Sequence, residues 1–313
     1  MIELLAKAAL QLVLLLLLAP LVTGVIRTLK ARLQTRRGPN PFQPYRDLSK
    51  LLHKGMVIPD TASWIFSATP YVVFATAALV GMMIPMTAAD APLSLFGGVL
   101  AVVYLLALGR FFLALGGLDA GSSFGGLGSS REMTISAIAE PAMMLAIFTV
   151  ALGANSTNLS EMASAALRQS WMFLAPSQML AFAALFIVLI AETGRIPVDN
   201  PATHLELTMI HEAMILEYSG PYLALIEWGA SIKQLVLMTL LVNTFFPFGL
   251  SRDWTASGFA FGLTVYVFKL LLLAGGIVLV ETTNAKMRLF RVPELLAVAF
   301  ILGALALIST FLF

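Results

Sequence analysis

Long uncharged apolar runs constrain this chain more than any other feature. About eight such runs approach or exceed the roughly 18 residues that a helix needs to cross a hydrocarbon core of about 30 Å. They lie near residues 5–26, 68–89, 94–115, 133–153, 174–191, 224–247, 258–280 and 294–313. Because backbone groups cannot stay unpaired in lipid, and the alternating pattern of a membrane barrel is absent, we expect an all-α, polytopic membrane protein. Residues 1–313 should form a single membrane domain.

The positive charges predict how the chain is oriented in the membrane. Of the 19 Lys and Arg residues, eight lie between Arg27 and Lys54, directly after the first apolar run. The positive-inside rule therefore places this segment in the cytoplasm, and with eight spans both termini face outward. Interpreting the first run as a secretory signal peptide is less favoured, because in a signal peptide the positive charges precede the apolar stretch. We expect a bacterial or archaeal plasma membrane location.

The chain contains no cysteine, and this bears on its redox chemistry. Iron–sulfur clusters and nickel–iron centres need thiolate ligands, so such groups must belong to partner subunits. The three histidines give little support for a metal site in this chain. His204 and His211 are about 10 Å apart along a helix, and the sequence at His211 lacks the second histidine of a zinc-protease motif. We expect no catalytic residue, metal site or cofactor in this chain, and no contact with nucleic acid.

Ionisable residues inside the predicted spans are the main functional candidates. Each costs a few kcal/mol at bilayer depth unless it is paired or hydrated. In addition, six of the 17 acidic residues lie between Glu192 and Glu227. Structural ion pairing between helices is the alternative for any one of them, but the set as a whole favours a proton or ion path. Arg110 also lies inside a predicted span, but we assign it no role in the predicted pathway. The predicted pathway residues are Glu140, Glu192, Asp199, Glu206, Glu212, Glu217, Lys233, Lys269 and Glu281.

The segments between the spans predict docking surfaces. Residues 27–66 combine positive charge, a Gly-Pro turn and an amphipathic stretch from Tyr45 to Lys54, which is typical of an interfacial helix. The Gly/Ser-rich stretch 117–132 is expected to be a loop that approaches a partner or ligand closely. A helix is expected from Thr203 to Tyr218, where neither Gly nor Pro occurs. The docking loops are thus 27–66, 117–132, 192–223 and 281–293.

Several of these segments resemble one known family. The sequence Glu192-Thr193-Gly194-Arg195-Ile196-Pro197-Val198-Asp199 is similar to the long cytoplasmic loop of complex I subunit 1. The first loop, with Arg37-Gly38-Pro39 and Pro44-Tyr45-Arg46-Asp47-Leu48, is most similar to the membrane subunit of group 4 energy-converting [NiFe] hydrogenases, the formate hydrogenlyase and hydrogenase 4 type. Further matches are Gly117-Leu118-Asp119-Ala120-Gly121, Ser130-Arg131-Glu132, Glu140-Pro141 and Lys233-Gln234-Leu235.

The resemblance implies a non-catalytic subunit that couples ion translocation (H⁺ or Na⁺) to a hydrogenase-type oxidoreductase. Its partners would be hydrogenase-like large and small subunits, which carry iron–sulfur clusters and possibly a NiFe centre, and antiporter-like membrane subunits. The residues expected to dock these partners are Arg36, Arg37, Gly38, Pro39, Arg46, Asp47, Asp119, Arg131, Glu132 and Arg195. Two alternatives remain open, a quinone-binding subunit of a complex-I-like dehydrogenase and a stand-alone ion transporter.

Overall fold

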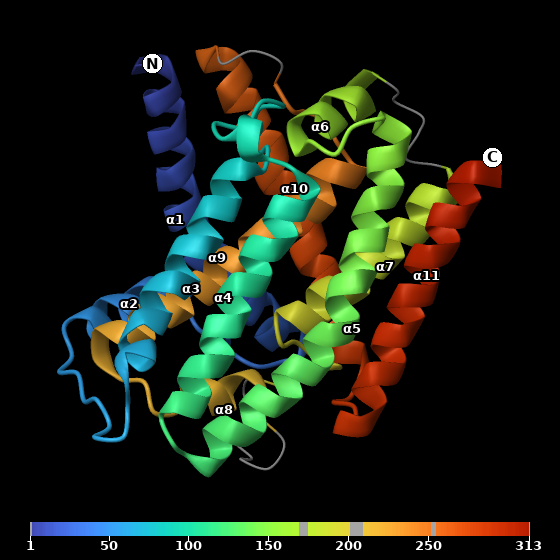
Figure 1. Ribbon diagram of the computed structural model, residues 1–313. Helices are drawn as coiled ribbons and strands as arrows, with labels where there is room; N and C mark the ends of the chain where they lie inside the picture. The colour runs from blue at the N-terminus through green and yellow to red at the C-terminus, as the bar shows by residue number, and fades with distance from the viewer. Residues whose placement is uncertain (1, 169–174, 201–208, 252–254, 313) are drawn as a thin grey trace.

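The computed structural model describes residues 2–168, 175–200, 209–251 and 255–312, which are helical with no β-strand (Figure 1). The α-helices are α1 (Ile2–Leu33), α2 (Gln43–Leu52), α3 (Trp64–Met83), α4 (Val99–Asp119), α5 (Ser123–Ala154), α6 (Leu159–Arg168), α7 (Pro176–Glu192), α8 (His211–Ile215), α9 (Gly220–Phe245), α10 (Ala256–Thr283) and α11 (Val292–Leu312). Two 3₁₀ turns, η1 (Ser94–Phe96) and η3 (Leu289–Arg291), precede α4 and α11. The predicted all-α membrane fold is confirmed.

Seven helices in the described ranges are long and apolar enough to cross a membrane, namely α1, α3, α4, α5, α9, α10 and α11. The remaining predicted span, 174–191, corresponds to α7, which is apolar but has only 17 residues. Both ends of the chain lie at the same end of the bundle as α6, whereas α8 lies at the opposite end (Figure 1). This arrangement agrees with an even number of crossings.

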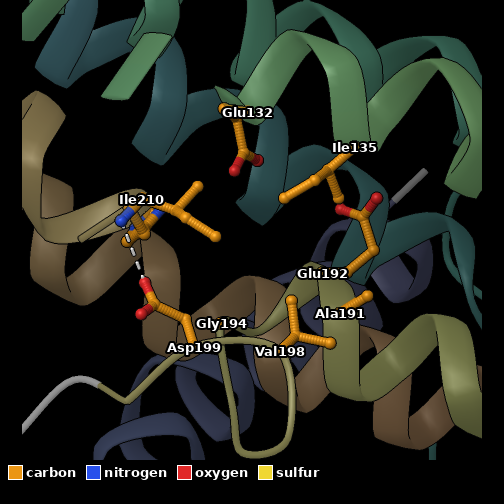
Figure 2. Close-up of a pocket in the computed structure, with 9 residues that line it drawn as sticks. Glu132, Ile135, Ala191, Glu192, Gly194, Val198, Asp199 and Ile210 are labelled. Atoms are coloured by element: carbon orange, nitrogen blue, oxygen red, sulfur yellow. Dashed lines mark hydrogen bonds between the residues drawn. The ribbon is translucent and has the colours of Figure 1, made fainter. Parts of the chain in front are cut away.

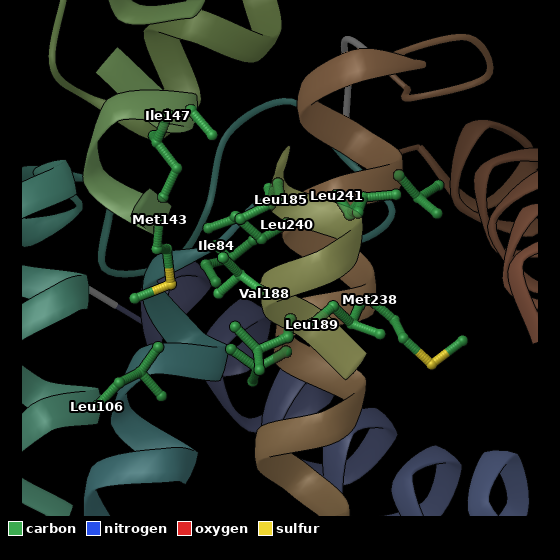
Figure 3. Packing of buried hydrophobic residues seen from close by; sticks show 14 of the residues in the cluster. Ile84, Leu106, Met143, Ile147, Leu185, Val188, Leu189, Met238, Leu240 and Leu241 are labelled. Atoms are coloured by element: carbon green, nitrogen blue, oxygen red, sulfur yellow. The ribbon is translucent and has the colours of Figure 1, made fainter. Parts of the chain in front are cut away.

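The centre of the bundle is a packed apolar core formed largely by α4, α5, α7 and α9. Figure 3 shows Met143 and Ile147 of α5 near Val188 of α7 and Leu240 of α9, all fully or almost fully buried. Helices in lipid associate mainly through van der Waals packing, which small residues strengthen by letting backbones approach closely. The contact between α5 and α11 follows this rule. A Cβ added at Gly303 of α11 would lie 3.4 Å from the Ala142 carbonyl oxygen and 3.6 Å from the Ala146 nitrogen of α5.

The amphipathic helix predicted in the first loop is confirmed as α2. A proline in the first turn suits a helix start, because its missing N–H has no intrahelical acceptor there. Pro44 and Leu48 are buried, while Arg46 and Lys50 are exposed, so α2 packs one face on the bundle. The basic segment before it is not wholly a loop, since α1 continues as helix to Leu33.

The prediction of a loop at 117–132 is wrong for most of these residues. Helix α4 ends at Asp119 and α5 begins at Ser123, so only three residues connect them. The glycines of this region allow the chain to pack against itself: a Cβ at Gly116 would lie 2.2 Å from the Tyr218 hydroxyl, and one at Gly125 would lie 2.2 Å from the Gly117 carbonyl oxygen. These glycines therefore permit close contact between α4, α5 and the segment before α9.

The helix expected from Thr203 to Tyr218 is confirmed for only part of its described residues. Residues 201–208 lie outside the described residues, and in the remainder only His211–Ile215 is helical. Tyr218 instead closes the segment by stacking on Phe66, with ring centroids 4.0 Å apart. Burial raises the pKa of the Tyr218 hydroxyl, so it remains a neutral hydrogen-bond donor to the Phe66 carbonyl.

Candidate functional site

A network of five charged side chains from four helices lies inside the bundle, and we call it the Arg110 network. Arg110 on α4 donates through Nη1 to Glu140 on α5 and through Nη2 to Glu192 on α7, each over 2.8 Å. Lys233 on α9 also binds Glu192, with Nζ and Oε2 2.8 Å apart. The fifth member, Glu132 on α5, has Oε1 3.8 Å from Nε of Arg110.

The burial of this network explains why its charges must be paired. The side chains of Arg110 and Glu192 are each only 3% exposed. An unpaired charge in such a place is very costly, whereas a hydrogen-bonded partner offsets much of the desolvation penalty. Two cations, Arg110 and Lys233, therefore contact Glu192, which is the most deeply buried carboxylate of the network. These ion pairs join α4, α5, α7 and α9 through charge-assisted hydrogen bonds.

A second network surrounds Arg195, just after α7, and we call it the Arg195 network. Arg195 donates to Glu281 at the end of α10 over 2.9 Å and to the Gln234 amide oxygen over 2.8 Å. Lys30 of α1 binds the other Glu281 oxygen, also at 2.9 Å. Burial lowers the pKa of the Arg195 guanidinium, and the neighbouring Glu281 carboxylate opposes this shift.

The two networks meet on α9 and α7. Lys233 belongs to the Arg110 network, and the next residue, Gln234, belongs to the Arg195 network. In the same way, Glu192 ends α7 and Arg195 follows three residues later. A displacement of the chain after α7 would therefore change the partners of both networks together.

A narrow cleft, whose volume open to water-sized groups is about 10 Å³, adjoins the Arg110 network near α8 (Figure 2). Its lining includes Glu132, Glu192, Asp199 and His211, between the apolar side chains of Ile135, Val198 and Ile210. Asp199 is held in place because it binds Lys286 at 2.7 Å and accepts the Ile210 backbone N–H at 3.1 Å. The cleft therefore has room for about one water molecule beside these carboxylates.

The comparisons with known proteins identify the family. The model of the family described as NADH dehydrogenase matches residues 6–312. The chain belongs to this family.

Within the NADH dehydrogenase family, the relatives come from hydrogenase and quinone-linked complexes. Formate hydrogenlyase subunit 4 of Escherichia coli K12 is 35% identical, covering 93% of this chain and 94% of that protein. Hydrogenase-4 component C of the same organism is 37% identical, covering 95% and 92%. An NADH-quinone oxidoreductase subunit of Syntrophobacter fumaroxidans is 34% identical, covering 77% and 76%.

The fold is shared with a solved member of an archaeal respiratory assembly. A chain of the membrane-bound sulfane sulfur reductase superposes on this protein with a TM-score of 0.84, covering 98% of this chain and 99% of that one, at 20% identity. Together with the spans, the relatives show a multi-pass membrane protein from a family of respiratory-complex subunits.

In this NADH dehydrogenase family member, the predicted pathway residues separate into groups. The structure brings Glu140, Glu192 and Lys233 into the Arg110 network, and it places Glu281 in the Arg195 network and Asp199 at the cleft. Glu206 is outside the described residues, and the other three lie elsewhere. Glu212 is the second residue of α8 and is half-buried, and Glu217 is exposed. Lys269 donates to the Phe246 carbonyl and the Asn243 side chain near the far end of α9.

The residues predicted to dock partners also divide. Arg36, Arg37, Pro39 and Arg46 are exposed around α2 and the preceding turn. The other six make contacts within the chain. Gly38 packs against α1, Asp47 accepts from Gln43, Asp119 accepts the backbone N–H groups of Ser63 and Phe66, Arg131 donates to the Met209 carbonyl, and Glu132 and Arg195 belong to the two networks.

Sequence reasoning missed the central position of Arg110. Its place in an apolar span marked it as ionisable, but the residues that it joins lie up to 82 positions away. The sequence analysis also assigned Glu132 to the docking residues, although the Glu132 carboxylate lines the cleft beside the Arg110 network. No three His, Asp or Glu side chains in the described ranges are arranged to hold a metal ion.

Proposed function

We propose that this chain is the membrane-anchoring and ion-translocation coupling subunit of a hydrogenase-type, complex-I-related oxidoreductase. The observation that carries the proposal is the Arg110 network, in which Glu192 is 3% exposed and lies beside a narrow cleft lined by further ionisable side chains. Buried ionisable residues within spans mark ion or proton pathways by default, because their cost is otherwise hard to explain. The relatives named formate hydrogenlyase subunit 4 and hydrogenase-4 component C support the assignment to the hydrogenase type.

The end of the bundle that carries the cleft is the candidate docking surface for the redox partner. The first loop and α2 present the exposed cations Arg36, Arg37 and Arg46 at this end. Cations near spans favour the cytoplasm, so this end faces inward and both termini face outward in the plasma membrane. Hydrogenase-like large and small subunits dock here, and antiporter-like subunits lie beside the bundle in the membrane.

Coupling then acts through the short segment between α7 and Asn200. A redox change in the docked subunit alters the charge or position of this segment, which carries both Arg195 and Asp199. Arg195 holds Glu281, and the adjoining Glu192 holds Arg110 and Lys233. A shift therefore changes which cation faces which carboxylate, and with it the proton affinity of the cleft.

The cofactors of the complex belong to the partners in this proposal. Iron–sulfur clusters, and possibly a NiFe centre, need thiolate ligands that this cysteine-free chain does not have. The subunit itself carries out no bond chemistry. Its side chains hold and move charge between the cytoplasmic end and the bundle.

The quinone-linked relatives support a second candidate function, the quinone-binding subunit of a complex-I-like dehydrogenase. That function needs an apolar tunnel between the first span and the sixth. In this structure α1 and α9 are in direct contact, because the Trp228 ring N–H donates to the Leu16 carbonyl over 3.2 Å. Gly24 of α1 is also so close to the Pro41 carbonyl that an added Cβ would lie 1.9 Å from the oxygen. The two hydrogenase-type relatives match over more of their own length, 94% and 92% against 76%, and we therefore place the hydrogenase-type function first.

Purification of the tagged chain in mild detergent from its own membranes tests the proposal. Mass spectrometry identifies the co-purifying subunits, and a nickel and iron assay reports their metals. We expect a cysteine-rich large subunit with nickel and iron. Iron without nickel, together with quinone-dependent activity, would support the second function instead. A chain that is recovered alone and without metal would contradict both.

A further inference from the structure

The turn between α10 and α11 carries an exposed aromatic ring between two exposed cations. Phe290 is 88% exposed, and the neighbouring Arg288 and Arg291 are exposed as well. The two arginines are the first and last residues of one hydrogen-bonded turn, because the Arg291 N–H donates to the Arg288 carbonyl over 2.9 Å. Aromatic rings beside basic side chains are typical of the level at which a membrane protein meets the lipid headgroups.

Helix α11 places this turn at the edge of the bundle. In the described part of the chain α11 packs on α5 and α7, and Figure 1 shows it at the edge of the bundle, beginning at the same end as α8. The outer face of α11 is apolar and exposed at a spacing of three or four residues, at Val298, Ile301, Leu305 and Ile308. An apolar stripe therefore extends along the membrane-spanning helix from the level of Phe290.

The turn is held in place by the segment that follows α7. Lys286 binds Asp199 at 2.7 Å, and the Met287 N–H donates to the Pro197 carbonyl over 2.8 Å. The charge of Lys286 is thereby paired within the chain. The two arginines, by contrast, project from a backbone that is already fixed, which lowers the entropic cost of binding a ligand.

The arginines of the turn carry positive charge that the chain itself does not pair. Among the described residues, no carboxylate lies within ion-pair distance of Arg288 or Arg291. Glu294 is close in sequence and exposed in the first turn of α11, so two cations stand against one anion and the turn keeps a net positive charge. Guanidinium groups match the oxygens of a phosphate, often through two hydrogen bonds at once.

We propose that this turn binds an acidic phospholipid from the leaflet at this end of the bundle. Its phosphate lies on Arg288 and Arg291, and an acyl chain lies along Phe290 and the outer face of α11. A lipid fits better than a partner protein, because the exposed ring continues into a membrane-spanning apolar stripe and the cations lie where headgroups lie. Since the turn is bonded to Pro197 and Asp199, the bound lipid also steadies the segment after α7.

Quenching of tryptophan fluorescence by lipids with brominated acyl chains tests the proposal. The purified full chain with Phe290→Trp is placed in nanodiscs that contain brominated phosphatidylglycerol or brominated phosphatidylcholine at the same mole fraction. The unaltered chain supplies the signal of the native tryptophans, which is subtracted. We expect both lipids to quench the tryptophan at position 290, and brominated phosphatidylglycerol to quench it more strongly.

The arginine variants test the headgroup contact in the same chain. Arg288→Gln with Arg291→Gln should lower the relative affinity for phosphatidylglycerol by roughly fivefold per arginine, the contribution typical of a basic side chain at an anionic membrane surface. Arg288→Lys with Arg291→Lys should retain most of the preference. Arg36→Gln with Arg37→Gln is the matched control, a pair of exposed arginines in the first loop, and should leave the preference unchanged.

Three results would overturn the proposal. Absence of additional quenching would place the ring outside the acyl layer, as a protein-binding surface would require. Equal quenching by the two lipids would show a membrane anchor that does not recognise charge. A preference that survives loss of both turn arginines, or that falls equally in the first-loop control, would assign it to the general positive charge of this end.

A second measurement covers the case in which Phe290→Trp fails to fold. Native mass spectrometry of the chain that retains Phe290 counts the bound phosphatidylglycerol molecules in the same arginine variants. We expect one fewer retained lipid when both turn arginines are replaced, and an equal number would contradict the site. Neither measurement needs a partner subunit, so the lipid site can be established or lost independently of the proposed function.

Discussion

Replacing Arg110 with Met should destabilise the bundle more than any single surface change. The substitution leaves Glu140 without its 2.8 Å partner and leaves Glu192 with Lys233 alone. Removing one partner of a buried ion pair costs about 3–5 kcal/mol, because the remaining charge stays buried. With an unfolding entropy of about 2.1 cal/mol/K per residue, a chain of 313 residues loses about 1.5 °C in melting temperature per kcal/mol. We therefore expect a fall of roughly 5–8 °C.

The assay is thermal unfolding of the purified chain in a mild detergent, followed by tryptophan fluorescence. Arg36→Met provides the matched control, because that side chain is exposed and surface substitutions usually stay within about 0.5 kcal/mol. The double variant Arg110→Met with Glu140→Gln should recover part of the loss, since it removes the carboxylate left unpaired. Equal melting temperatures for the two Arg→Met variants would refute the view that the network holds the helices together.

Two glycine substitutions test the close contacts at the docking end. Gly24→Ala should lower the melting temperature, because its Cβ would lie 1.9 Å from the Pro41 carbonyl oxygen. Gly276→Ala is the control and should leave the melting temperature unchanged, because a Cβ there would have nothing within 4 Å. Equal melting temperatures for the two variants would contradict the close contact at Gly24. Gly116→Ala should cost about 1–3 kcal/mol by overpacking against the Tyr218 hydroxyl. Adding Tyr218→Phe should restore part of that loss in the same melting assay, and strict additivity would show that the two groups do not meet.

The membrane-spanning architecture could be predicted because lipid leaves few choices. Every predicted span corresponds to a helix, since an apolar run of that length has no other stable structure across a bilayer. Boundaries were less predictable. The Gly/Ser stretch before Arg131 suggested a loop, because glycine usually lowers helix propensity. Tertiary contact overrides that tendency here, as the glycines let α4 and α5 pack against Met214 and Tyr218.

The candidate site could be predicted only in its residue types. A charge inside an apolar run marks Arg110, Glu140 and Lys233, but the sequence does not reveal which helices are neighbours. Arg110 and Glu192 are 82 residues apart and meet because α4 and α7 both pack on α5. The sequence also predicted a helix that extends through Glu217 to Tyr218. The helix there is only five residues long, so Glu217 lies beyond it and is exposed.

Redox-driven proton uptake by the reconstituted complex tests the central claim most directly. The complex purified on the tagged chain is placed in liposomes and supplied with reduced viologen, and the internal pH is followed with a trapped dye, with an uncoupler as control. We predict that Glu192→Gln keeps subunit assembly and viologen oxidation but loses proton uptake, whereas Glu294→Gln retains all three. Proton uptake at the unaltered rate in an assembled Glu192→Gln complex would contradict the claim that ions pass through the Arg110 network.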